Sequence, residues 1–175
     1  EGSLLAHAQD NGGDEGDLRI DGDISRNANG TATLDIRADR NILLSGYNLT
    51  ANDANSDGDN DAATDADSLN IIFNSDRDAD EDGRIEVYSS TINTLGGYVV
   101  MGGGNGDVGG ANGILGDGDG TGADDAFAYA VGDWHGISVF NNTSITTSGG
   151  DAIFHGNAKG AGTESGFTLF NNISF

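Results

Sequence analysis

The 175-residue chain contains no cysteine and no proline, and only 7 of its residues are lysine or arginine. The absence of cysteine excludes disulfides, thiolate metal sites and cysteine nucleophiles. The absence of proline excludes collagen-like and proline-rich disordered chains, so we assign the 30 glycines to turns. No apolar run approaches the roughly 20 residues that span a bilayer, so membrane insertion is not expected.

Acidic residues dominate the charge, because 29 aspartates and glutamates give a formal net charge of −22. This charge repels phosphate backbones and anionic lipid surfaces, so nucleic acid is not an expected partner. It also opposes compaction unless cations gather at the surface, which favours a calcium-bearing or high-salt environment. The first residues lack the basic region and apolar core of a signal peptide, so the sequence is interpreted as a mature piece or a fragment.

Short alternating apolar runs and the near absence of helical spacing predict an all-β protein. A chain of this length buries one core, so residues 1–175 are expected to form a single domain. Loop insertions are expected near residues 50–67, 76–83 and 102–125, which are acidic or rich in glycine. The predicted strands cover residues 18–20, 32–36, 42–44, 69–73, 85–88, 98–101, 127–131, 137–140, 152–154 and 167–170.

One sequence pattern recurs along the chain. Its copies begin at Gly83 and Gly136, a constant 53 residues apart, and its first half begins again 30 residues later at Gly166. Residues 40–49 match the same pattern at an offset of 43. Such repeats, with glycine at corners and alternate side chains turned inward, predict the stacked coils of a parallel β-solenoid. The residues predicted to face inward include Leu18, Ile20, Ile24, Leu34, Ile36, Ile42, Leu44, Leu49, Ile85, Val87, Ile92, Val139, Ile145, Leu169 and Ile173.

Residues 16–24 and 32–42, followed by residues 69–78, 83–85 and the corner 94–97, resemble the filamentous-haemagglutinin type of secreted bacterial exoprotein. The resemblance covers roughly residues 16–104. It implies a right-handed parallel β-helix, export through a two-partner secretion pore, and a place on the cell surface as an adhesin or biofilm filament. The chain departs from the family in being far shorter and in showing no clear trace of the dedicated secretion domain.

Two acidic loops have the alternating oxygen ligands of calcium sites. Such spacing lets a turning backbone wrap one hard cation, and in the second loop Gly83 and Ile85 complete a D-x-D-x-D-G-x-I pattern. The usual bidentate glutamate is absent, since Ser89 stands at that position, and a solvated acidic loop is the alternative. Ca²⁺ is predicted most strongly for the second loop. The candidate ligands are Asp53, Asn55, Asp57, Asp59 and Asp61 in the first loop and Asp76, Asp78, Asp80 and Asp82 in the second.

Paired asparagines recur at residues 141–142 and 171–172, which are equivalent places in the repeat. Asparagine tolerates left-handed corners and can stack its amide on the next coil, so we interpret these pairs as structural. N-glycosylation of Asn48, Asn142 and Asn172 is the alternative, because each begins an acceptor pattern.

Catalysis has little support from the sequence. Lys159 is the only lysine, and acidic pairs are too common to single out an acid and a base, so no catalytic residue is assigned. The histidines lack zinc-ligand spacing. Trp134 and Tyr129 are candidates for contact with sugars or proteins, although filling the interior is the favoured role of the aromatic residues.

These features together predict a non-enzymatic, extracellular structural or adhesive segment of a bacterial surface protein. Its expected partners are a host or neighbouring cell surface, a glycan, or like subunits in head-to-tail association. Two alternatives stay open: a self-assembling filament subunit, and a calcium-dependent β-helix enzyme that acts on polysaccharides.

Overall fold

The structure is a computed structural model that describes residues 4–9, 16–27, 30–52, 67–77, 82–103, 128–131, 135–159 and 166–175. All helices and strands assigned to these residues are β-strands, as the prediction of an all-β protein requires. The same residues contain no helix long and apolar enough to cross a membrane. The strands are β1 (Leu4–Ala8), β2 (Leu18–Ile20), β3 (Ile24–Arg26), β4 (Ala32–Ala38), β5 (Ile42–Ser45), β6 (Leu49–Ala51), β7 (Leu69–Ser75), β8 (Ile85–Tyr88), β9 (Thr91–Asn93), β10 (Val99–Gly103), β11 (Ala128–Val131), β12 (Ile137–Phe140), β13 (Ser144–Thr146), β14 (Ala152–Phe154), β15 (Gly156–Lys159) and β16 (Phe167–Phe170).

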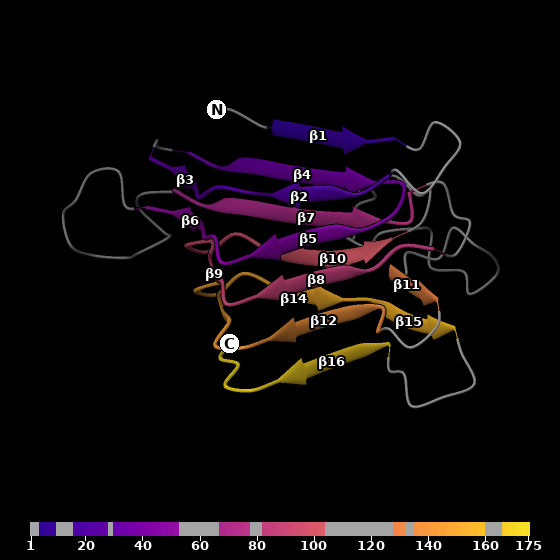
Figure 1. Cartoon of the computed structure of the whole chain (residues 1–175). Helices are drawn as coiled ribbons and strands as arrows, with labels where there is room; N and C mark the ends of the chain where they lie inside the picture. Colours follow the sequence, from indigo (N-terminus) through magenta and orange to yellow (C-terminus); the bar gives the residue numbers. More distant parts are fainter. Residues whose placement is uncertain are drawn as a thin grey trace.

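The strands form three main sheets, in which every pairing between described strands is parallel. Sheet A has the order β1-β4-β7-β10-β14, sheet B the order β2-β5-β8-β12-β16, and sheet C the order β3-β6-β9-β13, while β11 and β15 make a separate pair. Along the chain, strands enter sheets A, B and C in turn, so β4, β5 and β6 each occupy a different sheet. Figure 1 shows the strands stacked in this order, with β1 at one end and β16 at the other.

The strand register confirms two of the three predicted repeat offsets. Ile42 pairs with Ile85 and Leu49 with Ile92, which is the offset of 43. Ile137 pairs with Phe167, which is the offset of 30.

The constant offset of 53 between the first two copies is correct only for their second half. Ile92 pairs with Ile145 at that spacing, but Ile85 pairs with Ile137, one residue closer in sequence. The difference arises because the turn between β12 and β13 has one residue more than the turn between β8 and β9. An offset of 53 makes Gly136 equivalent to Gly83. In the structure, however, the carbonyl of Gly136 accepts the N–H of Ile85, so Gly136 lies beside Arg84.

The apolar core lies between the sheets and follows the alternation of the strands. In β4 every second residue is buried, and in β5 and β8 the inward side chains Ile42, Leu44, Ile85 and Val87 are fully buried. Burying such side chains is the main source of stability, at about 25 cal/mol per Å² of apolar surface removed from water. Most of the residues predicted to face inward are therefore in the core or packed against it.

Leu169 is the exception among the predicted inward residues, because it is 43% exposed. It lies in β16, the strand at the edge of sheet B, where its neighbour Phe167 is also 37% exposed. Leu169 pairs with Val139 of β12, which is fully buried, so its side chain points inward as predicted. Its burial was predicted wrongly. No further strand covers it in the described part of the chain.

Candidate functional site

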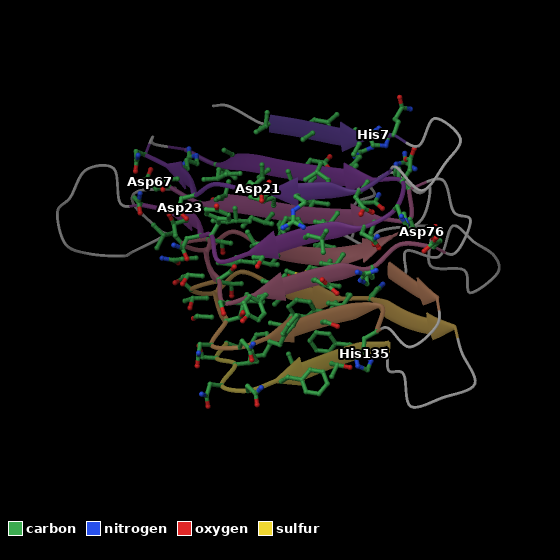
Figure 2. All side chains as sticks on the ribbon, in the orientation of Figure 1. His7, Asp21, Asp23, Asp67, Asp76 and His135 are labelled. Carbon is green, nitrogen blue, oxygen red and sulfur yellow. The ribbon has the colours of Figure 1, made fainter. Side chains whose placement is uncertain are left out.

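The corner between β7 and β8 holds the described part of the second predicted calcium loop (Figure 2). Asp76 directly follows β7, is 0% exposed, and adopts a left-handed φ of 52°. Its backbone N–H donates to the carbonyl of Arg40 at 3.1 Å. Its carboxylate Oδ1 accepts the backbone N–H of Asp82 at 3.4 Å. Asp76 therefore ties the two ends of this loop together.

Gly83 is required at this corner because there is no space for a side chain. A Cβ at this position would lie 2.5 Å from the carbonyl oxygen of Arg40 and 2.7 Å from Cα of Asp76. The hydroxyl of Ser75 donates to the carbonyl of Gly83 at 3.3 Å, which brings the two ends of the corner together. The glycine of the predicted calcium pattern thus has a packing role that does not depend on a bound cation.

Arg40 lies beside the same corner and partly offsets its negative charge. Its Nε is 3.6 Å from Oδ2 of Asp82, and both side chains are partly exposed. An ion pair of this kind contributes little to stability in water. The guanidinium nevertheless offsets the charge of Asp82, which is what a bound cation would also do.

The structure therefore brings together two of the predicted calcium ligands, Asp76 and Asp82. Within the described ranges there is no group of three or more histidine, aspartate or glutamate side chains placed to hold a metal. Calcium binding stays a prediction, since most of its ligands are not covered. The candidates outside the described residues are Asp53, Asn55, Asp57, Asp59, Asp61, Asp78 and Asp80.

Asparagine side chains connect successive strands at the start of sheet B. Asn41 is buried, donates through Nδ2 to the carboxylate of Asp17 at 2.7 Å, and accepts the N–H of Arg84 at 3.1 Å. Because one side chain satisfies groups on the strands before and after it, it fixes the register of all three. This role was not predicted from the sequence, although a polar residue stands directly before each of β2, β5 and β8.

Asn48 links neighbouring strands at the start of sheet C through its backbone on one side and its side chain on the other. Its N–H donates to the carboxylate of Asp23 at 2.7 Å, and its side-chain oxygen accepts the N–H of Thr91 at 3.0 Å. Asn142 and Asn172 lie at the turn that follows sheet B, both exposed and both in the left-handed region. The structural interpretation of the asparagine pairs is thus confirmed at this turn, while glycosylation of the three asparagines stays a prediction.

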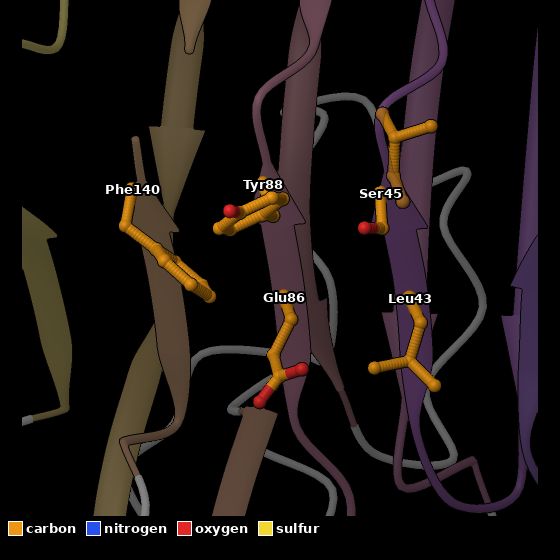
Figure 3. A pocket seen from close by; sticks show the side chains of 6 residues that line it. Leu43, Ser45, Glu86, Tyr88 and Phe140 are labelled. Carbon is orange, nitrogen blue, oxygen red and sulfur yellow. The ribbon is translucent and has the colours of Figure 1, made fainter. Parts of the chain in front are cut away.

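The outer face of sheet B carries a shallow hollow of about 230 Å³. Figure 3 shows Leu43, Ser45, Glu86, Tyr88 and Phe140 projecting into it from three neighbouring strands. The rings of Tyr88 and Phe140 meet edge to face, with centroids 5.0 Å apart and planes at 70°. Glu86 contributes the one carboxylate among the residues that line the hollow.

The structure places one of the two aromatic candidates from the sequence in a strand and leaves the other outside the described residues. Tyr129 lies in β11, and Trp134 falls outside the described residues, so their contact roles stay predictions. Tyr88 was not among the predicted surface aromatics, because residues 85–88 were predicted only as a strand. The alternation of that strand, with Ile85 and Val87 inward, was the signal that turns Tyr88 outward.

Comparison with known proteins does not assign the chain to a family. A scan against family models, a search of curated proteins and a search of solved structures each return no match for the chain. The class that the structure defines is an all-β protein built from parallel sheets. The resemblance to filamentous-haemagglutinin exoproteins is an expectation from the sequence alone.

Proposed function

We propose that this chain is a segment of a right-handed parallel β-helix that serves as a stiff, adhesive element on the outside of a bacterial cell. One observation carries the proposal: strands enter sheets A, B and C in turn and pair in parallel with the equivalent strand of the next round. A chain that winds in this way makes a rod whose backbone hydrogen bonds run along its axis. With coils about 4.8 Å apart, the described levels make a rod on the order of 20 Å long.

The register permits a direct test of this winding. Because Ile42 pairs with Ile85, deleting residues 42–84 removes β5, β6 and β7, one strand from each sheet, and leaves the next strands in register. We expect the shortened chain to fold cooperatively with an unchanged β-sheet circular dichroism spectrum. The matched control deletes residues 42–85, which shifts the register by one residue and turns inward side chains outward. Equal loss of folding in both deletions would contradict a wound rod.

The adhesive role is supported by the charge and by the rigid, exposed sheet faces. A net charge of −22 disfavours nucleic acid and anionic membranes as partners. Glycans and proteins on a cell surface are the partners that this charge permits. The test uses beads coated with the chain and offered to bacterial and host cells, with beads carrying the misregistered deletion as the control for charge alone. Adhesion by the folded chain only is the expected result. Cleavage of acidic polysaccharides in a parallel turnover assay would favour the enzyme alternative instead.

Self-assembly is a second candidate function, favoured by the exposed apolar end of sheet B. Phe167 and Leu169 stand at inward positions of β16, yet they are 37% and 43% exposed. A further coil, including one from a second copy of the chain, would cover them and pair with the strand edge. Electron microscopy of the purified chain tests this idea. Thr168 faces outward, so Thr168→Glu is the control for Leu169→Glu. Loss of filaments in Leu169→Glu but not in Thr168→Glu would support end-to-end stacking.

A further inference from the structure

We infer that the hollow on the outer face of sheet B is a binding site for a neutral or amino sugar. The inference gives a ligand class to the adhesive role proposed above and in that respect rests on it. Its geometry comes from three neighbouring strands, β5, β8 and β12. No sequence motif marks this face as a binding site.

The hollow exists because a small residue stands next to a large one in the same row. Ser45 on β5 pairs with Tyr88 on β8, which pairs with Phe140 on β12. All three point outward, because the residues that precede them, Leu44, Val87 and Val139, are fully buried in the core. The short side chain of Ser45 leaves open the space that a ring occupies on the next two strands.

The aromatic wall of the hollow is held in place before any ligand arrives. Tyr88 is 37% exposed, and its ring packs edge to face against Phe140. An edge-to-face contact of this kind favours one orientation of the ring. Because the ring stands on a paired strand, little freedom is lost when a ligand packs against it.

The polar wall is also oriented. Arg84 donates from Nε to Oε1 of Glu86 at 2.9 Å, and both side chains are only about one-fifth exposed. This contact fixes the direction of the carboxylate. An ionised carboxylate only accepts hydrogen bonds, so Glu86 selects a ligand that presents hydroxyl or N–H donors. The hydroxyl groups of Ser45 and Tyr88 both donate and accept.

A saccharide combines the two properties that these walls require. One side of a sugar ring presents C–H groups that can lie against Tyr88 and Leu43, while its hydroxyls can donate to Glu86. Arg84 offsets the charge of Glu86, but the net charge of −22 over the whole chain opposes uronates, sulfated sugars and phosphates, which narrows the ligand class to neutral or amino sugars. At about 230 Å³ the hollow is smaller than typical pockets for drug-sized ligands, which indicates a single sugar unit bound weakly.

The test is a direct binding measurement on the whole chain with defined oligosaccharides. Cellohexaose and mannohexaose represent neutral sugars, chitosan hexamer an amino sugar, and polygalacturonate and a heparin oligosaccharide anionic ones. Ligand-observed nuclear magnetic resonance detects weak contacts at millimolar concentration. We expect binding of at least one neutral or amino sugar and none of the anionic ones. No binding by a folded chain, or preference for an anionic sugar, would overturn the assignment.

Variants then place the bound sugar. Tyr88→Ala removes the ring and is expected to lower affinity at least tenfold, whereas Tyr98→Ala removes a partly buried tyrosine directly before β10 and leaves affinity unchanged. Ser45→Leu fills the hollow without removing a wall, so it tests the site even if Tyr88→Ala fails to fold. Binding that survives both Tyr88→Ala and Ser45→Leu would refute this site while leaving the adhesive role to another surface. Loss of cell adhesion with sugar binding intact would refute the adhesive role alone.

Discussion

Asn172 donates its side-chain amide to the side-chain oxygen of Asn142, 3.1 Å away and 30 residues earlier in the chain. Asn171 makes the same contact with Asn141 at 3.2 Å. All four residues have φ between 55° and 58°, a conformation that asparagine tolerates better than most residues. The turns that follow β12 and β16 thus have the same pair of asparagines, and the side-chain amides hold the two turns in register.

The first prediction separates the backbone role of this turn from its side-chain ladder. Asn142→Gly keeps the left-handed conformation and loses the amide contact, while Asn142→Ala loses the contact and strains the backbone as well. After allowing for the greater freedom of glycine in the unfolded chain, we expect the alanine variant to be about 1 kcal/mol less stable than the glycine variant. Urea denaturation measures the difference. Equal stability of the two variants would mean that the left-handed turn is not required.

The second prediction concerns the corner at Gly83. A Cβ there would overlap backbone atoms of Asp76 and Arg40, which cannot move without breaking the hydrogen bond between those two residues. Gly83→Ala is therefore expected to destabilise the fold by about 2–4 kcal/mol, in the range of other severe steric changes. Gly22→Ala is the matched control, because a Cβ at Gly22 meets nothing within 4 Å. Thermal unfolding of both variants, recorded by circular dichroism, makes the comparison, and similar melting temperatures would contradict the steric argument.

Much of the strand pattern was predictable from alternation. Residues 18–20, 85–88, 137–140, 152–154 and 167–170 were predicted as strands with the bounds that the structure has. The strands of sheet C were missed as strands, because each has only three residues and contains a single large apolar side chain. Those side chains were nevertheless predicted correctly as inward: Ile24, Leu49, Ile92 and Ile145.

The candidate site was less predictable, for a physical reason. Whether Tyr88 and Phe140 are neighbours depends on the pairing of β8 with β12, and the sequence repeat placed that pairing one residue away from the observed register. A shift of one residue exchanges inward and outward faces, so surface partners cannot be read from an approximate repeat. The hollow also needs Ser45 on a third strand, which only the full register supplies.

The third prediction contrasts two neighbouring leucines on β5. The side chain of Leu44 is 0% exposed and lies in the core, whereas that of Leu43 faces outward into the hollow (Figure 3). Leu44→Ala is expected to lower the free energy of unfolding by about 2–5 kcal/mol through lost burial and a cavity. Leu43→Ala is expected to lower it by under about 1 kcal/mol and to weaken saccharide binding instead. Urea denaturation and sugar titration of both variants check the two effects, and comparable destabilisation by both would contradict the assigned faces.

The fourth prediction tests calcium at the corner between β7 and β8. Four carboxylates spaced along the second loop repel one another by on the order of 0.5–1 kcal/mol per pair in water, so a bound cation would stabilise the fold. We expect added Ca²⁺ to raise the melting temperature and a chelator to lower it, and calorimetry to detect heat of binding.

Asp76→Asn provides the sharpest variant for this calcium test. Asparagine keeps an oxygen to accept the N–H of Asp82 and tolerates the left-handed backbone, so the corner stays closed while one ligand charge is lost. Its calcium response is expected to fall by several-fold. Asp151→Asn, an exposed residue between sheets C and A, removes the same charge and controls for the general effect of fewer carboxylates. An identical melting temperature with calcium and with chelator would contradict the calcium site. The guanidinium of Arg40, 3.6 Å from Asp82, would then be the cation that offsets the negative charge of this corner.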